Sequence, residues 1–265
     1  MNDHQPYALI TGASVGIGRA LAIECARRNM NLALIDLPES CLAVTIAHLR
    51  KNYSVNIRSL EVDLTTPNSA QKIYHWTKEE KITVGMLINN AGKGHLGSFT
   101  HYEHTFYEKM VRLNIESVVL LTRLFLPEML KLERAYIMNL GSIASFYPIP
   151  YKIVYAGSKS FIFSFSRALK EELRHTGVRV SVLCPGPIMT NQEVIQRIRR
   201  GGFWAKLSAM QPSKMAQIAI DQMMKGNAVI IPGRVNRFFK RASSVVPTFI
   251  KQKILVRKFN VEEKI

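Results

Sequence analysis

Three residues near the middle of the chain could together carry out acid–base chemistry: Ser142, Tyr155 and Lys159. Tyr155 and Lys159 are four positions apart, so on a helix their side chains share one face. A phenol has a pKa of about 10 and is a poor acid–base catalyst at neutral pH, but a neighbouring cation favours the phenolate and lowers that pKa. We therefore expect Lys159 to tune Tyr155 for proton transfer, with Ser142 reaching the same reacting atom. Because this spacing also occurs by chance on surface helices, it requires support from the rest of the chain.

The segments that must position these residues alternate between two kinds. Ser142 follows an apolar, strand-like run, whereas Tyr155 and Lys159 fall within a helical pattern. Strands are predicted at 7–10, 31–35, 55–62, 84–88, 135–140, 178–183 and 228–231, and helices at 19–29, 39–51, 67–81, 102–132, 151–174 and 212–225. This alternation predicts an α/β fold of the Rossmann type, a doubly wound, seven-stranded parallel sheet with helices on both faces.

A glycine-rich turn joins the first strand to the first helix. Gly12, Gly16 and Gly18 have the spacing GxxxGxG. Gly12 permits a tight turn, Gly16 lets the backbone approach a diphosphate, and Gly18 allows close packing of helix on strand. The helix N-terminus adds N–H groups and the positive end of its dipole, which favour an anionic ligand. The alternative is a glycine-rich turn without a ligand.

Acidic residues end the second and third strands. Asp36 lies 18 residues after Gly18, close to the separation of about 20 expected for an acid that binds ribose hydroxyls. A carboxylate there repels a 2′-phosphate, so Asp36 favours NAD(H), while Arg19 beside the turn leaves NADP(H) open. Alternatively, Asp36 caps the next helix. Asp63 could accept a hydrogen bond from an adenine amino group or cap the helix that Pro67 begins.

Further polar or small residues follow the later strands. The segment 89–92, with sequence NNAG, suits a backbone that passes beneath a flat cofactor ring, and 185–190 forms a proline-rich turn. Asn114 lies within an apolar helical pattern, where it is either a satisfied core amide or a residue that bends the helix and holds a water molecule. Ligands of doubly wound sheets bind beyond the carboxyl ends of the strands, so these residues predict one site on one edge of the sheet.

Together these motifs resemble those of the short-chain dehydrogenase/reductase family. The similarity runs from 7 to about 233 and covers TGASVGIG at 11–18, NNAG at 89–92, YAGSK at 155–159 and PGPIMT at 185–190. It implies an NAD(P)-dependent oxidoreductase that interconverts a carbonyl and an alcohol by hydride transfer. The implied catalytic tetrad is Asn114, Ser142, Tyr155 and Lys159.

In the role that the resemblance implies, Tyr155 delivers the proton and Ser142 donates a hydrogen bond to the carbonyl oxygen. Lys159 also holds the nicotinamide ribose, and Asn114 keeps a water that connects Lys159 to solvent. The residues implied to contact the cofactor are Gly12, Ser14, Gly16, Ile17, Gly18, Asp36, Asp63, Leu64, Asn90, Ala91, Gly92, Tyr155, Lys159, Pro185, Gly186, Ile188 and Thr190. The resemblance further implies a homodimer or homotetramer. A second hypothesis is a catalytically idle dinucleotide sensor or membrane-surface scaffold, against which the intact tetrad argues.

Length and composition indicate an ordinary globular chain with an unusual charge. The 265 residues are 47% hydrophobic and 21% charged, and the formal net charge is +17. No apolar run has the length of a membrane span, and the N-terminus lacks the features of a signal peptide. Three dispersed cysteines favour a reducing compartment. We therefore expect a cytoplasmic protein, or one that is peripheral at the inner face of a membrane if its positive charge meets anionic lipid.

The domain prediction divides the chain into a catalytic domain, 1–233, and a basic extension, 234–265. The catalytic domain includes an amphipathic lid segment, 189–211, over the site. The extension mixes basic and large apolar residues, which suits an anionic membrane surface, where hydrophobic acyl or sterol-like substrates are found. Alternatively it packs on its own domain or a second copy. Nucleic acid is not expected, because no nucleic-acid module is visible.

One short segment contains two histidines and a glutamate close together. His101, Glu103 and His104 superficially resemble metal ligands. No further ligand has a convincing spacing, so we expect no metal.

Overall fold

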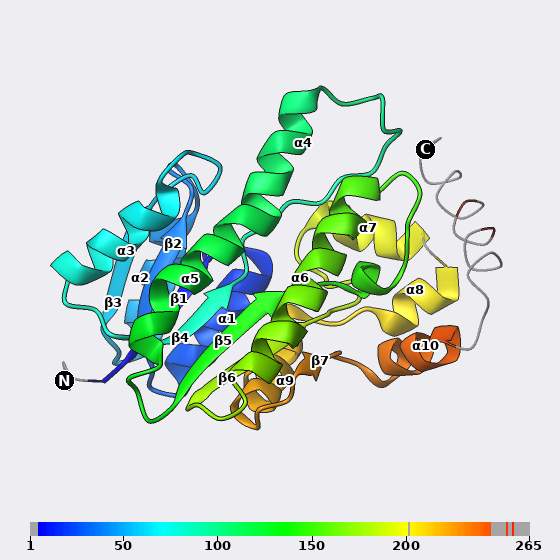
Figure 1. Cartoon of the computed structure of the whole chain (residues 1–265). Helices are drawn as coiled ribbons and strands as arrows, with labels where there is room; N and C mark the ends of the chain where they lie inside the picture. Colours follow the sequence, from blue (N-terminus) through cyan, green and yellow to red (C-terminus); the bar gives the residue numbers. More distant parts are fainter. Residues whose placement is uncertain (1–4, 201, 245–252, 254–255, 257–265) are drawn as a thin grey trace.

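The computed structural model describes residues 5–200, 202–244, 253 and 256, and within them seven parallel strands form one sheet (Figure 1). The strand order is β3–β2–β1–β4–β5–β6–β7. The strands are β1 (Tyr7–Thr11), β2 (Asn31–Asp36), β3 (Ile57–Glu61), β4 (Val84–Asn89), β5 (Ala135–Leu140), β6 (Val178–Leu183) and β7 (Val229–Ile230). The predicted Rossmann-type fold is confirmed. The order reverses between β1 and β4, which places the ligand-binding edge at the carboxyl ends of these two strands.

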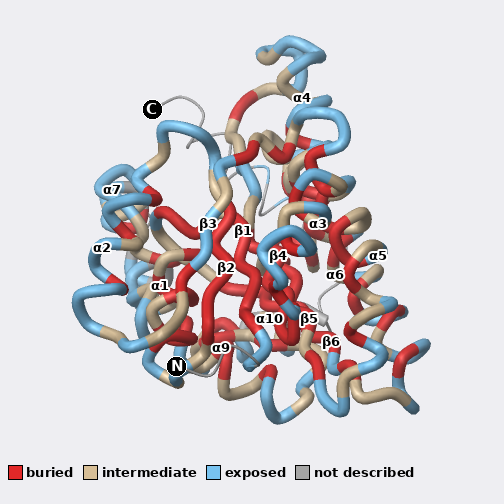
Figure 2. The backbone as a smooth tube through the Cα atoms, turned by 90° about the vertical axis from the view of Figure 1, so that its left-hand side faces the viewer, coloured by how far each residue is buried: buried red, intermediate tan, exposed pale blue. Residues whose placement is uncertain are grey.

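Helices cover both faces of the sheet. One face carries α1 (Gly16–Arg27), α2 (Leu42–Asn52) and α9 (Pro212–Met224), and the other carries α3 (Ser69–Glu79), α5 (Ser117–Met129) and α6 (Ile153–Glu172). Successive strand residues alternate between two apolar cores: Ile10 belongs to the first and Leu9 to the second. Figure 2 shows the central strands buried, whereas the edge strand β3 is largely exposed.

Three element boundaries differ from the sequence prediction for local reasons. The predicted helix 102–132 consists of α4 (His104–Val111), the π-helical turn η1 (Arg112–Glu116) and α5. Helix α6 begins at Ile153, because Tyr151 has a φ of 63° that a right-handed helix does not accept. The lid segment forms two helices, α7 (Gln192–Arg200) and α8 (Gly202–Ser208). The strand ends, which carry the predicted site, are close to where the sequence placed them.

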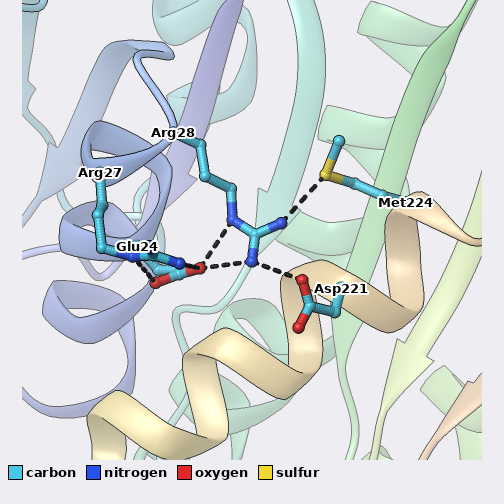
Figure 3. A network of polar contacts seen from close by, with 5 residues as sticks. All are labelled: Glu24, Arg27, Arg28, Asp221 and Met224. Atoms are coloured by element: carbon cyan, nitrogen blue, oxygen red, sulfur yellow. Dashed lines mark hydrogen bonds and ion pairs between the residues drawn. The ribbon is translucent and has the colours of Figure 1, made fainter.

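An ion-pair network joins α1 to α9 (Figure 3). The Glu24 carboxylate is buried and accepts hydrogen bonds from Arg27 at 2.8 and 2.9 Å and from Arg28 at 2.7 Å. Arg28 also donates to Asp221 at 2.6 Å, and its Nη1 lies 3.5 Å from Met224 Sδ. Burial alone would raise the pKa of Glu24, but the two arginines outweigh it and hold that pKa below its ordinary value. The network fixes α1, whose N-terminus faces the ligand edge.

The ends of the lid segment are held together beside the sheet. Met189 N donates to Met210 O at 3.1 Å, and Met210 N donates to Pro187 O at 3.1 Å.

Helix α10 (Arg234–Ser244) packs against α8 and the 3₁₀ turn η2 (Ile143–Phe146). Apart from Lys253 and Val256, the rest of the basic extension lies outside the described residues. Among the helices of the described part, none is long and apolar enough to cross a membrane.

Candidate active site

A crevice of about 760 Å³ opens at the carboxyl ends of β1, β2 and β4. It brings together the glycine turn, the two strand-end acids and the NNAG segment. The predicted cofactor residues that line it are Gly12, Ser14, Gly16, Ile17, Gly18, Asp36, Asp63, Leu64, Asn90, Ala91, Gly92 and Thr190. One edge of the sheet therefore carries them all, as the strand-end positions predict.

The glycine turn has the geometry that an anionic ligand requires. Gly16 has a φ of 57°, and Gly18 packs so closely that an added Cβ would lie 1.9 Å from the Gly12 carbonyl oxygen. Val15, the N-cap of α1, makes no side-chain capping bond, and the first turn holds no acid. The first N–H groups of α1 thus face the crevice with the positive end of the helix dipole, an arrangement that fits a diphosphate.

Asp36 supports the glycine turn as well as lining the crevice. Its Oδ2 accepts a hydrogen bond from Ser14 N at 2.6 Å, and its Oδ1 accepts one from Leu37 N at 2.8 Å. The carboxylate does not cap α2, whose N-cap is Cys41. The hydrogen bond from Ser14 to Asp36 joins residues that are 22 positions apart. It holds the negative charge of Asp36 beside the crevice.

Asp63 and Asn90 are likewise engaged with the backbone around them. Asp63 Oδ1 accepts from Thr65 N at 2.8 Å, so this acid closes a local turn, while α3 has Asn68 as its N-cap. Asn90 Nδ2 donates to the carbonyl oxygens of Thr11 at 2.8 Å and Gly12 at 3.0 Å. Asn90 therefore holds the glycine turn against the end of β4.

A second cavity, of about 270 Å³, contains three of the four predicted tetrad residues. Ser142, Tyr155 and Lys159 line it, together with the predicted residues Pro185, Gly186, Ile188 and Thr190. The residues that line both cavities are Ile17, Gly92, Lys93, Leu140 and Thr190. A ligand that follows the crevice from the glycine turn would therefore reach the tyrosine.

The electrostatics of Tyr155 and Lys159 differ from the sequence prediction. Burial raises the pKa of Tyr155, and a hydrogen bond from Ser142 acts in the opposite direction. Burial lowers the pKa of Lys159 to about 8. Lys159 Nζ donates to Leu140 O at 2.7 Å. Desolvation therefore dominates at both groups, and Lys159 does not depress the pKa of Tyr155 as the sequence predicts.

Asn114 lies inside the π-helical turn η1 and is completely buried. Its Oδ1 accepts from Lys93 N at 2.9 Å, and its Nδ2 donates to Lys93 O at 2.9 Å and to Ser158 Oγ at 3.1 Å. It is therefore a hydrogen-bonded core amide, as the first alternative predicts, and it lies in an irregular part of the helix, as the second predicts. It fixes the segment after β4 against α6 beside Lys159.

Several residues that line the crevice were not predicted from the sequence. Lys93 and Lys109 contribute cations to the crevice, and Lys93 Nζ lies 5.0 Å from the centroid of the Phe106 ring. Phe106, which lines the crevice, contacts the His95 ring edge-on, as do Tyr102 and Tyr107. The available signal was the density of aromatic residues between 99 and 107.

The candidate metal ligands form no metal centre in the described part of the chain. Neither there nor elsewhere in that part do three or more histidine, cysteine, aspartate or glutamate side chains gather closely enough to hold an ion. His101 instead packs edge-on against Tyr102, with ring centroids 4.8 Å apart.

Comparison with known proteins identifies relatives. The family model described as short chain dehydrogenase matches residues 6–198. The very-long-chain 3-oxoacyl-CoA reductase of Anas platyrhynchos is 32% identical over 200 residues, covering 72% of this chain and 62% of the relative. The 17-beta-hydroxysteroid dehydrogenase type 3 of Mus musculus is 34% identical over 190 residues, covering 69% of this chain and 60% of the relative. The chain thus spans less than two thirds of these relatives.

A solved structure is similar over nearly the whole chain. The short-chain dehydrogenase from Sphingobium yanoikuyae, in complex with NADPH, has a TM-score of 0.76 and 27% sequence identity, and the match covers 91% of this chain and 96% of that protein. The glycine turn, the parallel sheet and the serine–tyrosine–lysine cavity agree with the family match. The chain belongs to the short-chain dehydrogenase family.

Proposed function

We propose that the chain is an NAD(P)-dependent oxidoreductase that interconverts a carbonyl and an alcohol. The observation that carries the proposal is the shared wall of the two cavities, which joins the diphosphate-compatible glycine turn to Tyr155. A nicotinamide dinucleotide, when bound, supplies or accepts the hydride. The helix N-terminus of α1 and Asp36 would hold its diphosphate and ribose.

The chain's own residues manage the oxygen and the proton. In the reducing direction, negative charge grows on the substrate oxygen, Ser142 donates a hydrogen bond to it, and Tyr155 gives it a proton. The ammonium form of the buried Lys159 attracts the phenolate that remains. In the oxidising direction the same phenolate accepts the alcohol proton.

A substrate panel tests this function directly. Ketones and secondary alcohols are assayed with NADH, NADPH and their oxidised forms, and Tyr155→Phe is measured in parallel. We expect the variant to lose turnover by about 10²–10⁴-fold, because the acid–base group is gone, while it binds cofactor as the wild type does. Turnover by Tyr155→Phe close to that of the wild type would contradict the assignment.

For the cofactor, we propose a preference for NAD(H). Asp36 carries a negative charge beside the crevice, and Leu37, which follows it, offers no cation to a 2′-phosphate. The relative solved with NADPH leaves NADP(H) as the alternative outcome of the same assay.

For the substrate, we propose a hydrophobic carbonyl compound such as a 3-oxoacyl thioester or a steroid ketone. The names of the acyl-CoA reductase and the steroid dehydrogenase relatives support this class. The cavity around Tyr155 is bordered by the lid segment through Thr190 and Val194. 3-Oxoacyl-CoA substrates of increasing chain length, compared with 17-ketosteroids, would identify the class; activity confined to small polar ketones would contradict it.

We also propose that α8 and α10 contact an anionic membrane. Phe203 and Phe238 are 70% and 65% exposed on these two helices, which pack together. The exposed basic residues of the two helices are Lys206, Arg234, Arg237 and Arg241. Aromatic residues surrounded by cations suit the boundary between headgroups and acyl chains. The protein would then be cytoplasmic and peripheral at a membrane face, with the lid segment beside the lipid.

Liposome co-sedimentation tests the membrane proposal. The wild type should bind vesicles containing phosphatidylserine and not purely zwitterionic vesicles. Phe203→Ser with Phe238→Ser should abolish binding, whereas Phe99→Ser, at an exposed phenylalanine (56%) outside α8 and α10, serves as the control. We further propose a homodimer or homotetramer by analogy with the family, which light scattering coupled to size-exclusion chromatography would check.

A further inference from the structure

Ser145 connects the main chains of two tetrad residues at one buried point. It is 8% exposed and lies in the turn η2, three residues after Ser142. Its Oγ accepts a hydrogen bond from Ser142 N at 3.2 Å and donates one to Lys159 O at 2.8 Å. We propose that Ser145 is a positioning residue for the reaction at Tyr155, an inference that rests on the proposed oxidoreductase function.

The contacts of Ser142 determine which part of its hydroxyl faces the site. Ser142 Oγ accepts from Ala144 N at 3.1 Å and from the main-chain N–H of Ser145 in a reciprocal capping box. A hydroxyl has two acceptor lone pairs and one donor proton. With both lone pairs occupied by backbone amides, the proton is what Ser142 can offer to Tyr155 or to a substrate oxygen.

Ser145 supplies the returning bond of this capping box. Without the Ser145 side-chain oxygen, Ser142 N loses its partner and η2 loses one of the two hydrogen bonds of the capping box. Ser142 and Tyr155 line the same cavity, and hydrogen bonding by the Ser142 hydroxyl acts to lower the pKa of Tyr155 and so favours the phenolate form. Loosening the turn should therefore weaken that bond and leave the phenolate less stabilised, although Ser145 itself touches no reacting atom.

The same hydroxyl ties the turn to α6. Ser145 donates to the Lys159 carbonyl, and Ser160 Oγ donates to the Ser145 carbonyl at 2.9 Å. The thiol of Cys184 also contacts Ser145, and burial raises its pKa to about 12, so it stays neutral there. The Ser145 hydroxyl thereby holds the turn that carries Ser142 in register with the helix that carries Tyr155, whereas the bonds of Ser160 Oγ go to the carbonyls of Ser145 and Ala156, which are not tetrad residues.

The decisive variants are Ser145→Ala and Ser145→Thr. We expect Ser145→Ala to lower kcat about 10- to 100-fold and to leave the KM for the cofactor unchanged. In alcohol oxidation, the acidic limb of the plot of kcat against pH should shift to higher pH by about 1 unit, because Tyr155 releases its proton less readily. Ser145→Thr should restore both, since it keeps the hydroxyl and its methyl can enter the adjoining cavity of about 700 Å³.

Ser160→Ala is the matched control. It removes hydrogen bonds to the carbonyls of Ser145 and Ala156 but none to a tetrad residue. It should lower thermal stability without moving the pH limb. If Ser145→Ala also lowers stability and leaves kcat and the pH limb at wild-type values, Ser145 is merely structural and the inference is overturned. Should Ser145→Ala not fold, Ser145→Cys, with weaker hydrogen bonds, is compared with Ser145→Thr by the same criteria.

An optical titration separates failure of this inference from failure of the proposed function. Phenolate absorbance is followed against pH in wild type and Ser145→Ala, and the corresponding Tyr155→Phe curve is subtracted from each. A higher Tyr155 pKa in Ser145→Ala supports the positioning role even if no carbonyl compound is turned over. An unchanged Tyr155 pKa overturns it even if the wild type is an active reductase.

Discussion

At the scale of single residues, Asp36 combines two tasks that the sequence cannot separate. Its carboxylate anchors Ser14 N in the glycine turn and also places a negative charge beside the crevice. A substitution that removes the charge but keeps an oxygen acceptor distinguishes the two.

Asp36→Asn should raise the ratio of kcat/KM with NADPH to kcat/KM with NADH by about tenfold or more, because repulsion of the 2′-phosphate disappears. Steady-state kinetics with both cofactors measure the ratio. Glu39→Gln removes the same charge from an exposed position three residues later and serves as the control. If both variants change the ratio equally, net charge and not Asp36 selects the cofactor.

Lys159 makes a second residue-scale prediction, for stability. Burial takes its pKa from 10.5 to about 8. Between these values the unfolded chain holds the proton and the folded protein does not, so the free energy of unfolding rises with pH, by up to about 3 kcal/mol in total. Below pH 8 the folded protein bears the cost of the buried charge.

Lys159→Met should therefore be more stable than the wild type at pH 7, by about 2 kcal/mol after loss of the bond to Leu140 O. Its advantage should shrink between pH 8 and 9.5, while turnover is lost at every pH. Urea unfolding of the ligand-free proteins across this range gives the comparison. A difference that stays constant with pH would mean that Lys159 is not desolvated as described.

At the scale of elements, the pairing of α1 with α9 depends on one buried carboxylate. Glu24 bridges two arginines, and Asp221 meets only Arg28 at a more exposed position. Glu24→Gln should lower the free energy of unfolding by about 1–3 kcal/mol, whereas Asp221→Asn should cost less than about 1 kcal/mol. Chemical denaturation of both variants measures the free energy of unfolding. Equal losses would show that Asp221 contributes as much to the network as Glu24 does.

The same scale shows what could be read from the sequence. The strand ends and the spacing of Tyr155 and Lys159 were predictable, because each depends on neighbours within a few residues. The π-helical turn at Asn114 was not, since its hydrophobic pattern matches that of an ordinary helix. The contact of Asp36 with Ser14 and that of Ser145 with Lys159 join residues 22 and 14 positions apart, and the raised pKa of Tyr155 reflects burial that periodicity does not report.

At the scale of the whole molecule, the C-terminal region is connected to the site through Asn236 of α10. Asn236 is buried and its Nδ2 donates to Ser208 O at 3.1 Å and Pro232 O at 3.0 Å. Its side chain also packs against Gly186, where an added Cβ would lie 2.6 Å from Oδ1. The end of α8 and the proline turn are therefore held by one amide.

Asn236→Ala should raise the KM for the carbonyl substrate several-fold, because the lid segment loses its support at α8, while cofactor binding changes little. Stopped-flow or equilibrium titration of cofactor and steady-state kinetics of substrate separate these effects. Arg237→Ala is the control, because Arg237 is the neighbouring exposed residue and its Nη1 donates to Ile231 O at 3.1 Å. An unchanged substrate KM in Asn236→Ala would show that α10 and the lid segment act independently.

The pinned base of the lid segment has a consequence for how such proteins diversify. After β6 the chain passes Pro187 and comes back to it at Met210, just before α9, and the two points are joined by main-chain hydrogen bonds. The stretch 191–209, beyond the predicted cofactor residues Ile188 and Thr190, can therefore be exchanged, lengthened or changed in sequence without altering the strands beneath it. Grafting the equivalent stretch of a relative onto this chain should transplant that relative's choice of molecule while the hydride chemistry stays in place.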